Sequence, residues 1–283
     1  MYLWWDSEIQ TFLRKDCLRG NRNGWKCAFF NSSSIFDLIN LESLQAQQLV
    51  VPLRKLKNTS DTQAELLSVN GHTYFSKVVD FSSRKIESRL KYCFWPTRGV
   101  WSAFIAKHLA EAGISTPKPL AAGDKFHRGL VLMSGLITEA LVDAQGLDRY
   151  VRQLQEAEVL PLLCRLGKFL RQIHDIGIYH GDAQLSNLYM HGNQLGVWDL
   201  DSVRLYDKIP TVCRDNDIGR LLSSFLSTRT KDSETDRKDI VEAFADGYGH
   251  PVPVIKTALD VFERHPRQLH NWDLIKNKLT VGR

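Results

Sequence analysis

The chain has 283 residues, of which 43% are hydrophobic and 24% are charged, and its formal net charge is +5. This composition is ordinary for a globular protein, and the modest positive charge is compatible with an anionic substrate, an anionic membrane surface or a solvated basic face. The five cysteines are odd in number and have no C-x-x-C spacing, so we expect reduced thiols in a cytoplasmic protein rather than a disulfide framework or a zinc site. No signal peptide is expected at the N-terminus, and every apolar run is shorter than the roughly 18 residues that cross a bilayer.

Residues 1–46 form the first segment, which we expect to be an N-terminal extension. Its aromatic residues, including Trp4 and Trp5, lie among basic residues such as Arg14 and Lys15. Aromatic residues among basic ones are found in membrane-interface anchors and on nucleic-acid-binding surfaces. An extra helix and strand packed on the main domain accounts for them as well, and we favour that interpretation.

Short strands follow and predict a small antiparallel sheet. Apolar or alternating runs cover residues 49–53, 64–69 and 72–79, and the Asn-Gly pair between the last two is a strong hairpin signal. Lys77 lies on the third of these strands. The turn between the first two strands contains no glycine, so a glycine-rich phosphate-covering loop is absent. The basic residues of that turn are either phosphate contacts or part of an exposed surface.

Helices and strands alternate in the middle of the chain. The basic, aromatic segment 84–98 is followed by a predicted helix at about 100–112. The apolar run at 129–136 predicts a buried strand with a polar exit. Further helices are expected at 147–155 and 160–176, and the second of them carries apolar residues at spacings of three and four.

The stretch I-Y-H-G-D-A-Q-L-S-N-L-Y-M-H-G-N-Q-L-G-V-W-D-L-D-S, residues 178–202, is the most informative part of the sequence. Asp182 and Asn187 lie in a polar turn, and two short strands joined by a Gly-Asn turn lead to Asp199. A hairpin brings its outer ends together, so we expect the three side chains at one end of it. A carboxylate and an amide there offer oxygen ligands for Mg²⁺, and the other carboxylate is placed to accept a hydroxyl proton. The alternative is a turn whose Asp and Asn only cap their own backbone.

The remainder of the chain is predicted to be helical. One helix begins near Asp217, and others are expected at 235–247 and 254–264. A basic amphipathic tail at 271–278 either docks on the helical domain, which we favour, or faces a membrane.

The pattern H-G-D-x-x-x-x-N, followed by a strand and D-L-D, resembles the catalytic loop and metal-binding aspartate of the protein-kinase-like phosphotransferases, H-R-D-x-x-x-x-N and D-F-G. The phrases Y-F-x-K, R-G-x-W-x-A and L-x-x-x-G-I-x-T-P-x-P-L resemble one branch in particular, the lipopolysaccharide core kinases (Kdo and heptose kinases) of Gram-negative bacteria. The resemblance covers about residues 49–225. It implies an α+β, two-lobed protein-kinase-like fold, with a small antiparallel-sheet N-lobe at 47–137 and a mostly helical C-lobe at 138–283.

The resemblance also implies roles for residues of the C-lobe. Asp182 is the expected catalytic residue, and Asn187 and Asp199 are the expected metal ligands. Asp201 is expected to bind a second metal ion or the substrate. His180 and Asp217 are expected to support the catalytic loop rather than to react.

In the N-lobe, Lys77 is expected to bind the nucleotide phosphates. The segment after the buried strand is expected to be the hinge, where the nucleotide base meets the backbone of Ile137, Thr138 and Glu139. A glutamate that pairs with the strand lysine in kinase-like folds is missing, since its position falls near Ala103. Substitutes from either side are Glu87 and Glu111.

These expectations imply an ATP- and Mg²⁺-dependent kinase that phosphorylates a heptose or Kdo hydroxyl of the lipopolysaccharide inner core. The segment after Asp201 is too short for a long activation segment, which favours a sugar over a peptide acceptor. The expected partner is an anionic glycolipid at the cytoplasmic face of the inner membrane, with peripheral membrane contact and no nucleic acid. One alternative is an aminoglycoside-type phosphotransferase, which the basic segment 84–98 disfavours. The other is a pseudokinase that acts as a binding module.

Overall fold

The structure is a computed structural model that describes residues 18–22, 25–29, 50–59, 61–69, 71–229 and 236–264. The chain divides into two compact units. The first holds the described residues up to Glu111 together with Thr116–Val142, and the second holds Ala112–Ser115 and the described residues from Asp143 onward. The tryptophans near the N-terminus and the predicted tail at 271–278 lie outside the described residues.

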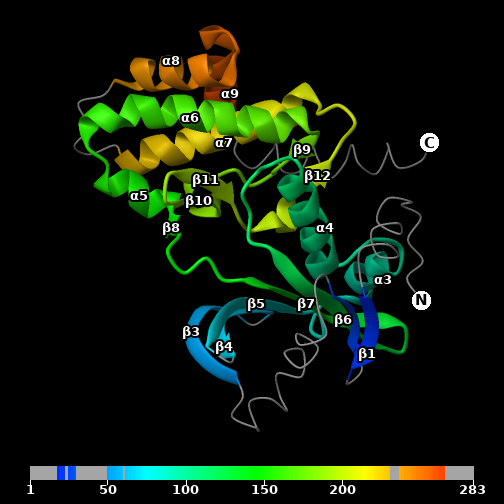
Figure 1. Cartoon of the computed structure of the whole chain (residues 1–283). Helices are drawn as coiled ribbons and strands as arrows, with labels where there is room; N and C mark the ends of the chain where they lie inside the picture. The colour runs from blue at the N-terminus through cyan, green and yellow to red at the C-terminus, as the bar shows by residue number, and fades with distance from the viewer. Residues whose placement is uncertain are drawn as a thin grey trace. The chain divides into compact units, whose positions relative to one another are not determined.

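A seven-stranded antiparallel sheet forms the first unit (Figure 1). In spatial order its strands are β1 (Leu18–Arg22), β2 (Trp25–Phe29), β6 (Pro119–His127), β7 (Leu130–Glu139), β5 (His72–Asp80), β4 (Thr62–Val69) and β3 (Val50–Asn58). The hairpin of β1 and β2 comes from the segment expected to be an N-terminal extension packed on the main domain, and β2 pairs along its length with β6. The described part of that segment therefore continues the sheet. The first unit also runs to Val142, beyond the lobe boundary expected after residue 137, because β7 is longer than the predicted strand.

The hairpin of β4 and β5 confirms the one predicted from the Asn-Gly pair. Its register runs without interruption from Thr62 opposite Val79 to Val69 opposite His72. On its other side β5 pairs with β7, which places Lys77 opposite Leu136 in the centre of the sheet. Successive side chains of a strand point to opposite faces, so Lys77 shares a face with Val79.

Two helices of the first unit pack against the sheet. They are α3 (Ile86–Phe94) and α4 (Arg98–Glu111). From α3, Tyr92 packs with Val79, Phe81 and Val131 in a buried cluster. Because Val79 belongs to this cluster, the face that carries Lys77 is the face next to the helices. The basic segment that was predicted only to precede a helix contains α3 itself.

The second unit is mostly helical, as predicted. Its helices are α5 (Leu147–Gln153), α6 (Glu156–Asp175), α7 (Thr211–Arg229), α8 (Arg237–Tyr248) and α9 (Val252–Arg264). Helix α6 packs against α8, and α7 packs against α9 (Figure 1). The apolar stripe predicted for α6 is buried in this core. None of the described helices is both long and apolar enough to cross a bilayer.

Two small sheets complete the second unit. In the first, β10 (Leu188–His191) pairs with β11 (Gln194–Val197) on one side and with β8 (Gln145–Gly146) on the other. In the second, β9 (Ile178–Tyr179) pairs with β12 (Arg204–Leu205). Since β9 and β12 are paired, the chain between them forms a loop whose two ends lie side by side. This loop contains most of the stretch 178–202 described in the sequence analysis.

Candidate active site

The H-G-D turn follows directly after β9. Gly181 has a φ of +76°, a left-handed conformation that glycine adopts readily. A Cβ atom at this position would lie 2.8 Å from the carbonyl oxygen of Ser202, which is closer than side-chain atoms normally come. A residue larger than glycine would therefore have to move the backbone at the point where the chain presents Asp182.

Asp217 of α7 holds the turn from its buried side. Its carboxylate is fully buried and accepts the backbone N–H groups of His180, at 2.7 Å, and Gly181, at 2.9 Å. His174 Nε2 lies 3.3 Å from the same carboxylate, and His174 Nδ1 lies 2.7 Å from the hydroxyl of Tyr248. Burial raises the pKa of the Tyr248 hydroxyl, so it stays protonated and donates to His174, which in turn donates to Asp217. These hydrogen bonds to the Asp217 carboxylate fix the turn.

His180 is buried beneath the same turn, with 1% of its surface exposed. Burial lowers the pKa of its imidazole, although the carboxylates of Asp217, Asp182 and Asp199 act in the opposite direction. Nδ1 accepts the backbone N–H of Asp182 at 3.3 Å, so the neutral ring carries its proton on Nε2, which has no hydrogen-bond partner among the described residues. A neutral, buried ring of this kind braces the loop and is not placed to act as a base.

Asp182 lies at the exposed side of the turn and is held by side chains. Asn187 Nδ2 donates to its Oδ2 at 2.8 Å and to its backbone carbonyl oxygen at 2.9 Å. Gln184 Nε2 lies 3.3 Å from Oδ2, and Arg220 Nη1 lies 2.9 Å from Oδ1. With a side chain that is 31% exposed, this carboxylate is fixed in orientation and still open to a substrate.

The hairpin brings Asp199 next to this pair, as the sequence predicted for its outer ends. The backbone N–H of Trp198 donates to the carbonyl oxygen of Asn187 at 3.1 Å, which extends the pairing of β10 and β11 by one step. Asp199 then leaves the hairpin with a φ of +54°, an uncommon left-handed conformation for a residue other than glycine. Asp201 follows in the short helical turn Leu200–Ser202, whose last residue is the one that approaches Gly181.

The residues at the hairpin base fit a magnesium ion. Because the amide nitrogen of Asn187 is directed at Asp182, its side-chain oxygen is the atom left for a cation, and Asp199 adds an exposed carboxylate. No group of three or more His, Cys, Asp or Glu side chains in the described part of the chain is arranged to hold a metal. Mg²⁺ commonly binds through one or two protein oxygens together with water and phosphate oxygens, which is what this donor set allows.

The predicted nucleotide-binding residues belong to the first unit. Lys77 lies in the centre of the sheet on the face next to the helices. At the end of β7, the backbone N–H of Glu139 donates to the carbonyl oxygen of Lys118 at 3.0 Å, and that of Ala140 donates to Thr73 at 3.2 Å. The expected contact of a base with Ile137, Thr138 and Glu139 therefore depends on groups other than the Glu139 N–H, and it stays a prediction.

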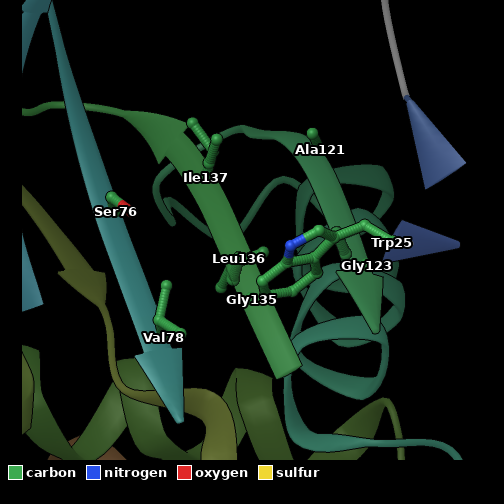
Figure 2. A pocket seen from close by; sticks show the side chains of 9 residues that line it. Trp25, Ser76, Val78, Ala121, Gly123, Gly135, Leu136 and Ile137 are labelled. Carbon is green, nitrogen blue, oxygen red and sulfur yellow. The ribbon is translucent and has the colours of Figure 1, made fainter. Parts of the chain in front are cut away.

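A small hollow also lies on the first unit, on the face of the sheet opposite Lys77 (Figure 2). Ser76 and Val78 of β5 line it, and the indole of Trp25 lies over Gly135, where an added Cβ atom would come within 3.3 Å of the ring. Its volume of about 40 Å³ has room for a few water molecules and not for a nucleotide. This hollow is thus distinct from the predicted phosphate-binding face.

The acid that would pair with Lys77 is absent from the interior of α4. Ala103 is fully buried there, and Glu111 at the helix end forms an ion pair with Lys107 at 2.9 Å. Glu87 lies in the first turn of α3 and is exposed. Of the two predicted substitutes, Glu111 is therefore already engaged by another residue.

An N-terminal antiparallel sheet, a helical C-terminal part and an H-G-D turn beside D-L-D together define a protein-kinase-like phosphotransferase fold. The Lipopolysaccharide kinase (Kdo/WaaP) family matches residues 79–248, more than half of the chain, and the chain belongs to this family. The resemblance seen in the sequence is confirmed.

Known proteins are similar over part of the chain. A 3-deoxy-D-manno-octulosonic acid kinase of Vibrio cholerae is 31% identical over 130 residues, which is 46% of this chain and 53% of that protein. The protein of the same description from Haemophilus influenzae is 28% identical over 134 residues, 46% of this chain and 54% of its own length. The chain thus matches little more than half the length of these relatives. A solved structure, "WaaP in complex with acyl carrier protein", has a TM-score of 0.56 at 19% identity and covers 80% of this chain and 92% of that one, which supports the fold.

Two residues at Asp182 were missed by the sequence analysis, Gln184 and Arg220. Arg220 is one helical turn beyond Asp217 on α7, so both side chains lie on the same side of that helix. Since Asp217 was expected to face the catalytic turn, this spacing is the signal that could have identified Arg220.

Proposed function

We propose that the chain is an ATP-dependent kinase that phosphorylates a sugar hydroxyl of the lipopolysaccharide inner core. The observation that carries this proposal is the convergence of Asp182, Asn187 and Asp199 at the base of one hairpin, in a chain of the lipopolysaccharide kinase family. The described relatives are 3-deoxy-D-manno-octulosonic acid kinases, which favours that sugar, Kdo, over heptose as the acceptor. The acceptor is an anionic glycolipid, and the protein would meet it at the cytoplasmic face of the inner membrane.

In the proposed reaction, the acceptor oxygen forms a bond to the γ-phosphorus of ATP while the bond from that phosphorus to the β–γ bridging oxygen breaks. Asp182 orients the acceptor hydroxyl and accepts its proton, which then passes to solvent. Asn187 and Asp199 would hold Mg²⁺ through oxygen atoms. A bound magnesium ion supplies charge neutralisation for the phosphates. Asp201, on the same loop, is proposed to bind a second cation or the substrate.

The first unit is proposed to bind the nucleotide. Lys77 would neutralise the phosphate oxygens as a compact cation, while residues Ile137, Thr138 and Glu139 would border the base. We expect Lys77→Ala to weaken MgATP binding at least tenfold, measured by the ligand-induced rise in melting temperature. Lys91→Ala is a matched control, because Lys91 is an exposed lysine of α3 whose ammonium lies over the Tyr92 ring.

A pseudokinase is the second candidate, since Ala103 stands where the helix glutamate is expected and the turn after β3 has no glycine. An aminoglycoside-type enzyme is disfavoured by the net charge of +5, because a polycation requires an acidic pocket.

One experiment separates these functions. The full chain is incubated with MgATP and a lipid A precursor that carries Kdo, and the mass of the lipid product is measured by mass spectrometry. A gain of one phosphate group, dependent on both ATP and Kdo, is the expected result. A rise in melting temperature with MgATP but no transfer to any lipopolysaccharide acceptor would establish the pseudokinase instead.

A further inference from the structure

Arg220 of α7 contacts the carboxylate on which the proposed reaction depends. Its Nη1 donates to Asp182 Oδ1 at 2.9 Å, and the two side chains are 20% and 31% exposed. Arg229, on the same helix, has a different environment: its guanidinium binds two backbone carbonyls at the end of α5 and the carboxylate of Glu156. Arg229 thus ties the helix to its neighbours, whereas Arg220 is directed at the reaction site.

The hydrogen bonds that the described residues make to Asp182 leave one position for an acceptor hydroxyl. A carboxylate offers about four lone-pair positions, two on each oxygen. Asn187 and Gln184 donate to Oδ2, at 2.8 and 3.3 Å, and occupy both positions there. Arg220 occupies one position on Oδ1. The remaining position is therefore on Oδ1, beside the guanidinium.

Helix α9 contacts the guanidinium of Arg220 through the ring of Phe262. The Cζ atom of Arg220 lies 5.2 Å from the centre of the Phe262 ring, a distance at which a cation and an aromatic face attract each other. Gly219 allows this approach, because a Cβ atom there would lie 2.5 Å from Phe262 Cβ and 2.6 Å from the carbonyl oxygen of Ala258. Helix α9 begins at Val252, after the end of the family match at residue 248.

We propose that Arg220 is a positioning residue for phosphoryl transfer, which holds Asp182 so that the acceptor hydroxyl binds at Oδ1, and that α9 holds Arg220 through Phe262. The inference rests on the proposed function. It places a permanent positive charge next to the acceptor oxygen. An acceptor with its own negative group close to the reacting hydroxyl, such as an acidic sugar, benefits from this charge, whereas a cationic acceptor is repelled.

The test uses the full chain with MgATP and the Kdo-bearing lipid acceptor. For Arg220→Ala we expect kcat to fall roughly 10- to 100-fold, the size of effect that follows the loss of a hydrogen bond between charged groups. The KM for MgATP should stay within about twofold of the wild type, while the KM for the acceptor rises. Arg220→Lys should retain an intermediate rate, because it keeps the charge without the planar fork.

Added guanidinium ion, at concentrations far below those that unfold the protein, should restore part of the activity of Arg220→Ala. It should have no effect on Arg229→Ala, whose loss is structural. In α9, Phe262→Leu should lower kcat severalfold, whereas Ile255→Val, a conservative change in the core of the same helix, should lower only the melting temperature.

The outcomes are distinct. A wild-type kcat for Arg220→Ala, in a protein whose wild type transfers phosphate, would overturn this inference and leave the proposed function intact. The inference would also be overturned if Arg220→Ala and Arg229→Ala lost activity to the same extent and added guanidinium ion did not restore the activity of Arg220→Ala. If the wild type transfers no phosphate, both the proposed function and this inference fail.

Discussion

The buried side of the H-G-D turn and its exposed side each centre on an aspartate, and the two carboxylates are held in different ways. On the buried side, Asp217 accepts two backbone N–H groups and is fully enclosed. On the exposed side, Asp182 is bound by the side chains of Asn187, Gln184 and Arg220 and keeps part of its surface in solvent. Backbone donors cannot leave without unfolding the turn, whereas the side-chain donors of Asp182 leave one position on Oδ1 open to a substrate. The buried carboxylate thus makes the turn rigid, whereas the exposed carboxylate stays accessible to a substrate.

The largest change is expected at the buried carboxylate. Asp217→Ala leaves two buried backbone N–H groups and His174 without their acceptor, so we expect the free energy of unfolding to fall by about 3–5 kcal/mol. Activity should be lost with it. Urea unfolding followed by circular dichroism measures the first effect. A stability close to that of the wild type would contradict the role of Asp217 in holding the turn.

At the exposed carboxylate, we expect a substitution to lower activity strongly and stability only slightly. Asp182→Ala should lower kcat by roughly 10²- to 10⁴-fold, the range lost with an acid–base group, while stability changes by less than about 1 kcal/mol. Binding of MgATP, followed by thermal shift, should persist. Equal turnover by the variant and the wild type would remove Asp182 from the mechanism.

Between the two lies Gly181, where a smaller change is expected. Gly181→Ala should lower stability by about 2–3 kcal/mol, because it combines a left-handed φ with the contact to Ser202. Gly249→Ala is the matched control: its φ is +74° but a Cβ atom there meets nothing within 4 Å, so about 1 kcal/mol is expected. The same loss in both variants would show that the close contact is unimportant.

The smallest effect concerns the pH dependence of folding. The pKa of His180 is lowered by burial from its ordinary value of 6.5, so below that pH the unfolded chain binds a proton that the folded chain does not. Stability should therefore fall as the pH drops below about 6.5, by at most about 1.4 kcal/mol per pH unit from this group. The unfolding free energies of the wild type and of His180→Gln are measured from pH 7 to about pH 5. The difference between them isolates the contribution of His180. A difference that is independent of pH would contradict it.

The sequence predicts local structure better than long-range pairing. The β4–β5 hairpin, the stripe of α6 and the two strands before Asp199 follow from turn residues and periodicity, and the structure confirms them. The hairpin of β1 and β2 lies in the segment predicted as an N-terminal extension packed on the main domain; its pairing with β6 was not predicted, because it joins segments far apart in the chain. Helix α3 was missed since basic residues and the exposed apolar side chains of Ile86 and Leu90 obscure its apolar period.

The candidate site shows the same limit. The convergence of Asp182, Asn187 and Asp199 was predicted because a single hairpin produces it. The contact between Arg220 and Asp182 depends instead on how α7 lies against the turn, and the support from Phe262 depends on the packing of α9 on α7. Periodicity within one segment carries no information on such contacts between segments.

The pairing of β2 with β6 has a practical consequence for anyone who shortens the chain. A truncated protein that starts near residue 47 would lose β1 and β2 and leave the backbone of Ala121–Lys125 without its neighbouring strand. An uncovered strand edge of this kind recruits further chains and promotes aggregation. Removal of the N-terminal hairpin is therefore expected to favour aggregation, whereas a shortened chain that keeps the hairpin leaves this strand edge covered.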